Sequence, residues 1–199
     1  AAAAFFAGAA FFAVLFFGLK GAFQPMMDAE NARAIARVMA KNPQITEEMM
    51  AGNRAMGEKL APFMVLIGVP IAVLFVGLFT WGAGKMVGAK ATLGAATMIA
   101  TYSYFPRLLE LLVSGAQVLL LPEEQITGRA SVSLGAARAL DPDTASTALM
   151  AVLMRVDVFT LWVTFLIAVG LRVVGKVPMS KALVAAGVVW VLGGLFTFL

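Results

Sequence analysis

The chain has 199 residues, 61% of them hydrophobic, and contains neither cysteine nor histidine. Without these residues it cannot form disulfides, thiolate nucleophiles, iron–sulfur or imidazole metal sites, or a Ser-His-Asp triad. The net charge of +4, from 15 Lys and Arg against 11 Asp and Glu, is spread over polar segments, which favours anionic lipid headgroups over nucleic acid as a partner.

Five apolar blocks dominate the sequence. A helix rises about 1.5 Å per residue, so roughly 20 apolar residues cross a hydrocarbon core of about 30 Å. The blocks that approach or exceed this length are residues 1–20, 60–86, 92–121, 156–175 and 178–199. The sequence therefore predicts an all-α fold. We expect one membrane domain over residues 1–199, a polytopic transmembrane bundle of five helices, with amphipathic surface helices in the polar segments 25–59 and 122–148.

The opening of the chain is low in complexity. Residues 1–18 contain only Ala, Phe, Gly, Val and Leu. They lack the basic n-region of a signal peptide, so we expect the first membrane span here. With so few residue types, no individual side chain before Lys20 is assigned a role.

The first polar segment is expected to hold two helices. Pro25 and Asp28 are typical of a helix start, and Asn42 with the proline after it is typical of a helix end. This predicts a short amphipathic helix on the membrane surface or on a partner. Thr46 is the expected N-cap of the next helix, which should continue into the second span with a bend at Pro62.

The third span carries Pro106 in its middle and is longer than the hydrocarbon core. Proline removes a backbone donor and clashes with the preceding turn. A helix kinked at Pro106 is therefore expected, in preference to two half-helices that meet there.

The second polar segment ends in a strong helix signal. The run Asp141-Pro142-Asp143-Thr144 combines an Asx cap, a proline at the first helical position and an acid in the first turn. We expect a helix to begin there and to continue into the fourth span.

Basic residues in two short turns give the expected orientation. With five spans, the N-terminus lies on the same side as the turns near residues 82–91 and 172–181. These turns contain no acid and five basic residues: Lys85, Lys90, Arg172, Lys176 and Lys181. The positive-inside rule then places the N-terminus in the cytoplasm.

Arg107 and Glu110 are the sharpest candidates for a functional site. If the third span crosses the bilayer once, both lie near its middle, where an unpaired charge costs about 2.5–3.5 kcal/mol. Their i, i+3 spacing lets them pair on one helix face. The favoured interpretation is a structural ion pair, with Ser103 as a further hydrogen-bonding group. The alternative is an ion or substrate pathway beside a broken helix.

Other residues join this intramembrane polar cluster. Asp157, at the start of the fourth span, is expected to begin a helix or to pair with Arg155, and a less favoured alternative makes it a partner of Arg107. Tyr102 and Tyr104 are expected to pack and to donate interfacial hydrogen bonds. No set of catalytic, cofactor-binding or metal-ligating residues is recognisable, so an enzyme is not expected.

Three stretches resemble the bacterial branch of the Yip family, over most of residues 60–199. They are Tyr102-Ser103-Tyr104-Phe105-Pro106-Arg107-Leu108-Leu109, Arg155-Val156-Asp157-Val158-Phe159-Thr160-Leu161-Trp162, and Gly170-Leu171 followed by Lys181-Ala182 and Trp190. The resemblance implies five spans with a cytoplasmic N-terminus, in a bacterial cytoplasmic (inner) membrane. Eukaryotic relatives bind prenylated Rab GTPases, but the acidic-tyrosine-glycine-proline motif before their first span is missing here, so GTPase binding is not implied.

The leading hypothesis is a non-enzymatic integral membrane scaffold or interaction protein of the Yip-like type. The alanine-rich opening favours an accessory subunit of a large respiratory or photosynthetic membrane complex, whose proteins, lipids or pigments would contact its apolar faces. No cofactor of its own is expected. Two alternatives stay open: a small channel or transporter that uses Arg107 and Glu110, and a membrane-shaping protein.

Overall fold

The computed structural model describes residues 2–42, 44 and 47–195, and these residues form helices and loops without a strand. The α-helices are α1 (Ala2–Gly18), α2 (Lys20–Lys41), α3 (Glu47–Met86), α4 (Leu93–Ser103), α5 (Pro106–Leu120), α6 (Thr147–Leu153), α7 (Val158–Gly175) and α8 (Met179–Leu195). Between α5 and α6 lie the short 3₁₀ helices η1 (Glu123–Gln125), η2 (Arg129–Val132) and η3 (Ala136–Ala139).

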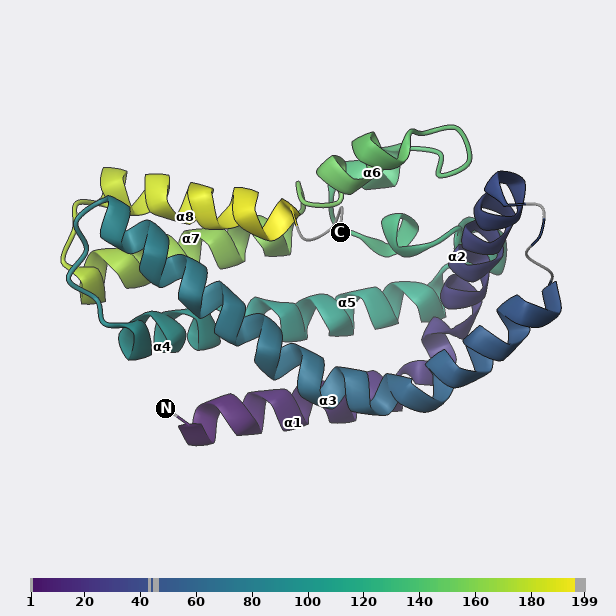
Figure 1. Cartoon of the computed structure of the whole chain (residues 1–199), viewed down its shortest axis with the longest axis horizontal. Helices are drawn as coiled ribbons and strands as arrows, with labels where there is room; N and C mark the ends of the chain where they lie inside the picture. Colours follow the sequence, from purple (N-terminus) through teal and green to yellow (C-terminus); the bar gives the residue numbers. More distant parts are fainter. Residues whose placement is uncertain (1, 43, 45–46, 196–199) are drawn as a thin grey trace.

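The long helices run back and forth along the long axis of the molecule (Figure 1). α1, the consecutive pair α4 and α5, and α8 run one way, whereas α3 and α7 run the other way. α3 packs against α1, α4 and α8, and α7 packs against α4, α5 and α8. The result is an elongated helical bundle.

Two helical segments of the described residues are long and apolar enough to cross a membrane, Leu66–Met86 and Val158–Gly175, and Met179–Leu195 is a shorter apolar helix. The expected all-helical fold is therefore confirmed for the described residues. The five-span arrangement stays a prediction, since α4 and α5, with 11 and 15 residues, are each too short to cross the core alone.

Small residues let the helices approach closely where α3, α4, α7 and α8 meet. The buried cluster combines Ile99 of α4 with Ile167 and Leu171 of α7 and with alanines from α3, α7, α8 and the turn after α3. The amide of Lys90 donates to the carbonyl of Gly175 at 2.9 Å, which joins the turn after α3 to the turn after α7. Close packing of small residues is a main source of helix association in lipid, where apolar side chains gain little from being buried.

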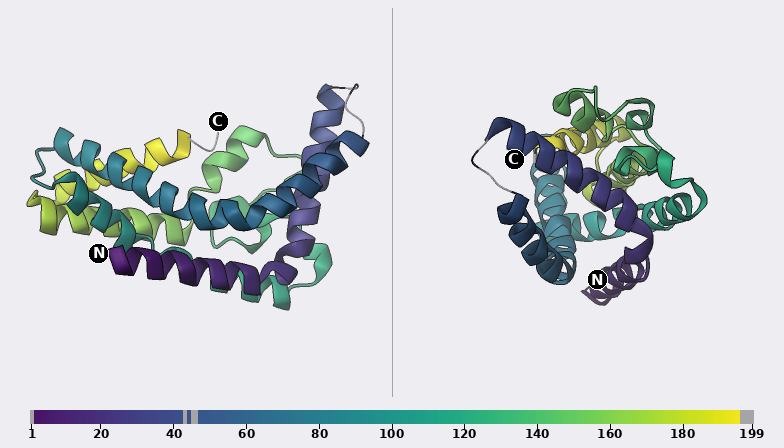
Figure 2. Two further views of the ribbon diagram at one scale, coloured as in Figure 1. Left: turned by 60° about the horizontal axis from the view of Figure 1, so that its bottom comes forward. Right: turned by 90° about the vertical axis from the view of Figure 1, so that its right-hand side faces the viewer.

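α2 begins earlier than expected. Pro25 lies inside the helix rather than at its start, because the helix begins at Lys20. The backbone is almost continuous with α1, since the amide of Phe23 donates to the carbonyl of Leu19 at 3.1 Å. The chain bends sharply between α1 and α2 (Figure 1, and the left view of Figure 2). The expected end at Asn42 is confirmed.

α2, which was expected to lie on the membrane surface or on a partner, packs against other parts of its own chain. Phe23 and Met26 are buried against Val118 of α5 and against Ile126 and Val132 of the second polar segment. On the exposed side, the Glu30 carboxylate accepts a hydrogen bond from the backbone amide of Arg129 and forms an ion pair with its guanidinium. The helix is thus held on the loops after α5 by an apolar face and by a charged edge.

The continuity of α3 is confirmed. The helix runs from Glu47 to Met86, 40 residues, so the expected surface helix and the second span are one element. It changes direction along its length in Figure 1. The predicted N-cap, Thr46, lies outside the described residues.

The preference for one kinked helix in the third span was wrong. α4 ends at Ser103 and α5 begins at Pro106. The missing proline amide leaves the Tyr102 carbonyl without its usual donor, and the amide of Phe105 bonds to that carbonyl instead, at 3.3 Å. Two residues in a tight turn therefore separate two half-helices.

The helix expected from Asp141 also begins elsewhere. The Asp141 carboxylate accepts from the amide of Asp143 in a local turn, and α6 starts only at Thr147, with Ser146 as its N-cap. α6 ends at Leu153, so it does not continue into α7. The side-chain turn competed successfully with the helix for the same backbone donor.

We expect Gly170→Ala to destabilise the bundle, because a Cβ there would lie 2.4 Å from Cγ2 of Ile99 across the α4–α7 contact. Overpacking of this kind costs about 1–3 kcal/mol. Gly187→Ala is the matched control, since a Cβ at Gly187 meets nothing within 4 Å. Thermal unfolding in detergent, followed by circular dichroism, measures both. In an Ile99→Ala background the extra cost of Gly170→Ala should vanish; equal losses for the two glycines would contradict this packing.

Candidate functional site

Asp157 is the N-cap of α7 and is buried. One carboxylate oxygen accepts from the amides of Phe159 and Thr160, at 2.9 and 3.1 Å, and the other accepts from the Thr160 hydroxyl. Aspartate is among the best residues for this position because it satisfies amides that have no partner within the helix. The expectation that Asp157 begins a helix is consistent with this arrangement.

A close backbone contact holds Asp157 in place. The segment around Gly135 pairs with the start of α7 through an isolated β-bridge, in which the amide of Ala136 donates to the carbonyl of Val156 at 2.9 Å. A Cβ at Gly135 would lie 2.6 Å from the Cβ of Asp157. Only glycine permits this approach, which ties the loop after α5 to α7.

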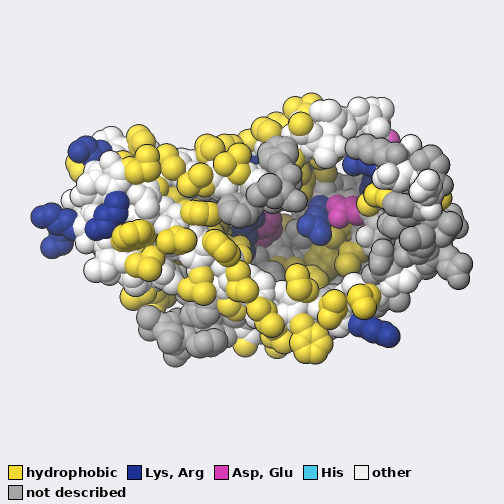
Figure 3. Space-filling view, in the orientation of Figure 1, with side chains coloured by type: hydrophobic (Ala, Val, Ile, Leu, Met, Phe, Trp, Pro, Cys, Tyr) yellow, Lys and Arg dark blue, Asp and Glu magenta, His cyan; other side chains and the backbone are white. Residues whose placement is uncertain are grey.

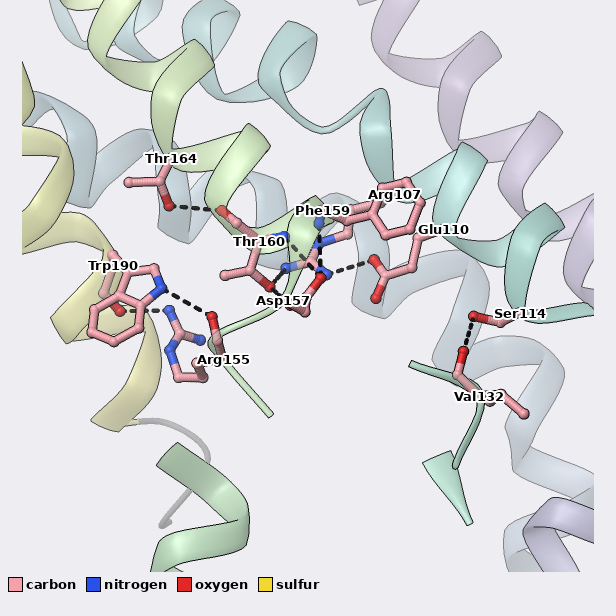
Figure 4. A network of polar contacts seen from close by, with 10 residues as sticks. All are labelled: Arg107, Glu110, Ser114, Val132, Arg155, Asp157, Phe159, Thr160, Thr164 and Trp190. Carbon is pink, nitrogen blue, oxygen red and sulfur yellow. Dashed lines mark hydrogen bonds and ion pairs between the residues drawn. The ribbon is translucent and has the colours of Figure 1, made fainter. Parts of the chain in front are cut away.

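Arg107, in the first turn of α5, connects this cap to a second acid. Its guanidinium donates to the carboxylate of Glu110 at 2.5 Å and to the hydroxyl of Thr160 at 2.9 Å. Glu110, Arg107, Thr160 and Asp157 therefore form one chain of hydrogen bonds between α5 and α7 (Figure 4). The Thr160 hydroxyl accepts one bond and donates the other, as a single hydroxyl can.

Arg155 and Trp190 form a second contact, between the start of α7 and α8. The Arg155 guanidinium donates to the Trp190 carbonyl, and the indole N–H donates to the Arg155 carbonyl at 3.3 Å. The guanidinium carbon also lies 5.2 Å from the centre of the indole ring, a cation–π distance (Figure 4). Gly193 and Gly194 leave room for this side chain, since a Cβ at Gly194 would lie 3.0 Å from its Nε.

The structure brings only some of the expected residues together. Arg107, Glu110 and Asp157 join through Thr160, whereas the expected Arg155–Asp157 pair is not among the ion pairs between described side chains. Tyr102 is exposed and stacks on Phe105 at a centroid distance of 6.3 Å. Tyr104, half-buried, follows α4, and Ser103 is buried between α4 and α7.

Sequence reasoning missed Thr160 and the role of Trp190. The spacing of Asp157 and Thr160, three residues apart at a helix start, is a capping signal that could have pointed to the threonine. No local signal points to Trp190, because its contact with Arg155 joins residues 35 positions apart.

This arrangement suits a structural role better than catalysis. Each charged group of the hydrogen-bonded chain has a partner of opposite charge or an amide or hydroxyl. Among the described residues, no group of three or more Asp or Glu could hold a metal ion. The cluster connects three helices and neutralises charge that would otherwise face an apolar environment.

The described residues are mainly helical, include two helical segments long and apolar enough to cross a bilayer, and bond Arg107 to Glu110 within α5 and to Thr160 of α7, which are features of a helical membrane protein. The chain belongs to the Yip1 family, because the family model described as the Yip1 domain matches residues 1–199. The protein is accordingly membrane-associated. Neither the curated proteins nor the solved structures contain a match to this chain.

Thr160→Val should lower the free energy of unfolding by about 1–3 kcal/mol, because it leaves Arg107 and Asp157 each with an unfilled hydrogen bond. Thr160→Ser, which keeps the hydroxyl, should retain most of the stability. Thr164→Val is the control, since the Thr164 hydroxyl donates only to the backbone of its own helix. Equal melting temperatures for the two valine variants in detergent would rule out the connecting role of Thr160.

Proposed function

We propose that this Yip1-family protein is a non-enzymatic integral membrane scaffold that organises other membrane components through its apolar sides. The observation that carries the proposal is the exposure of large apolar side chains along α3 and α7. Leu66, Ile67 and Leu74 of α3 are between 50 and 58% exposed, and Leu161 and Phe165 of α7 are about half exposed. Such a surface needs lipid or other membrane proteins to cover it.

The distribution of charge supports five spans and a cytoplasmic N-terminus. The turns after α3 and α7 meet through the Lys90–Gly175 hydrogen bond, so their basic residues gather at one end of the bundle. Figure 3 shows basic side chains at this end and hydrophobic ones across the middle. We place this end on the cytoplasmic side of a bacterial inner membrane, beside anionic headgroups.

The scaffold proposal takes precedence over a channel or transporter because Arg107 and Glu110 have each other and Thr160 as partners. A charge that already has its hydrogen bonds filled offers little to a passing ion. In a finer version of the proposal the protein is an accessory subunit of a respiratory or photosynthetic complex, with the exposed side of α3 as the surface that meets the other subunits.

Topology can be tested by single-cysteine labelling, since the chain has no cysteine of its own. We expect a membrane-impermeant maleimide to label Thr144→Cys from outside intact spheroplasts, and Lys176→Cys only after the membrane is opened. Both positions are exposed, and Ala168→Cys, fully buried, is the unlabelled control. Labelling of both exposed positions from the same side would contradict the five-span topology.

Partner contact can be tested with a photoreactive amino acid at Leu74, which is 52% exposed. We expect a covalent adduct with another membrane polypeptide, identified by mass spectrometry, and no adduct from Ala168. Liposomes that contain the purified protein should show no ion flux. Ion flux that is lost in the Arg107→Gln variant, together with crosslinks from Leu74 to lipid alone, would contradict the scaffold proposal and support a channel.

A further inference from the structure

A cavity of about 400 Å³ lies between α3, α5, α7 and α8, next to the polar cluster. Its polar lining comes from Tyr104, Arg107, Arg155, Thr160 and Thr164. The volume lies in the range of ligand-binding pockets.

The charge of the lining is unbalanced. Two arginines line the cavity, and no carboxylate is among its lining residues. Glu110 pairs with Arg107 outside the lining, and Asp157 is engaged as the cap of α7. Arg155 has no ion pair among the described residues, and its Nε is buried without a hydrogen-bond partner. A buried cation with an unfilled donor is stabilised by an anion within reach.

The opposite part of the lining is apolar. It consists of Ile71, Phe75 and Phe79 of α3 with Ile167 of α7 and Val189 of α8. Phe75 is 48% exposed and also lines the cavity, so the cavity borders the exposed apolar side of α3. A fully hydrated anion fits this border poorly, because it would have to cross an apolar surface.

The two kinds of lining are separated along the bundle axis. The polar residues on α7 and the glycine on α8 lie at the beginning of α7 and the end of α8, about halfway along the molecule (Figure 1). The apolar residues on the same helices, Ile167 and Val189, lie deeper. An anionic group beside the arginines, with an apolar chain that runs toward Ile167 and Val189, has this polarity.

We propose that this cavity binds one anionic phospholipid, with its phosphate beside the guanidinium groups of Arg155 and Arg107 and one acyl chain along α3 and α7. Guanidinium groups are the favoured donors to a phosphate, and the Nε of Arg155 is a donor without a partner. The site lies at the start of α7 and the basic turns lie at the other end of that helix, so the site is distinct from headgroup attraction at the turns.

The test uses the full chain, purified and delipidated in mild detergent, with phosphatidylglycerol, phosphatidylcholine or inorganic phosphate as the probe. We expect native mass spectrometry to show one retained phosphatidylglycerol, and the melting temperature to rise with that lipid alone. Arg155→Gln should weaken binding about tenfold or more. Arg172→Gln, an exposed arginine at the other end of α7, is the charge-matched control.

A second variant keeps the test decisive if Arg155→Gln does not fold. Ala72→Leu places bulk in the cavity and leaves both arginines intact, and it should also weaken phosphatidylglycerol binding. Three results would overturn the proposal: equal binding of the two lipids, stabilisation by inorganic phosphate to the same extent as by phosphatidylglycerol, or an equal loss in Arg172→Gln. Either of the first two results would mean that the cavity does not select an anionic phospholipid. The third would mean that the lipid is attracted by surface charge and not by the cavity.

Discussion

The charge of Arg107 has to be neutralised inside the bundle, and much of the architecture follows from how this is done. In an apolar environment a guanidinium keeps its charge, so it needs several acceptors at fixed positions. Glu110 supplies one from the same helix and Thr160 supplies another from α7. Because Thr160 also donates to Asp157, the same hydroxyl connects Arg107 to the cap that starts α7.

The break between α4 and α5 places Arg107 where these acceptors are. Because of the break, Arg107 lies in the first turn of α5, beside the first turn of α7. Pro106 ends the hydrogen-bond pattern of α4 and begins α5, and Arg107 follows it directly. Gly135 contributes from the other direction, since its contact with Asp157 holds the loop after α5 against the start of α7.

With the charges satisfied inside or gathered at one end, the sides of the bundle stay apolar. α3 is the clearest case, because Leu66, Ile67 and Leu74 are at least half exposed along it. A protein with such sides acts through what covers them, whether lipid or another membrane protein. The cavity beside Arg155 interrupts this pattern with an unfilled cationic group, which makes it the most selective feature of the surface.

The sequence by itself determined the helical class, two of the apolar helices and the i, i+3 pairing of Arg107 with Glu110, and it indicated a helix start as one of the roles open to Asp157. These depend on length, composition and spacings of three or four residues, which a local pattern contains. The tertiary structure decided the break before α5, the later start of α6, and the contacts of Thr160 with Arg107 and of Trp190 with Arg155. The first two depend on which local hydrogen bonds form, of Phe105 with Tyr102 and of Asp143 with Asp141, and a residue pattern does not specify that choice. The other two join residues 53 and 35 positions apart, and only the packed helices bring these residues within bonding distance.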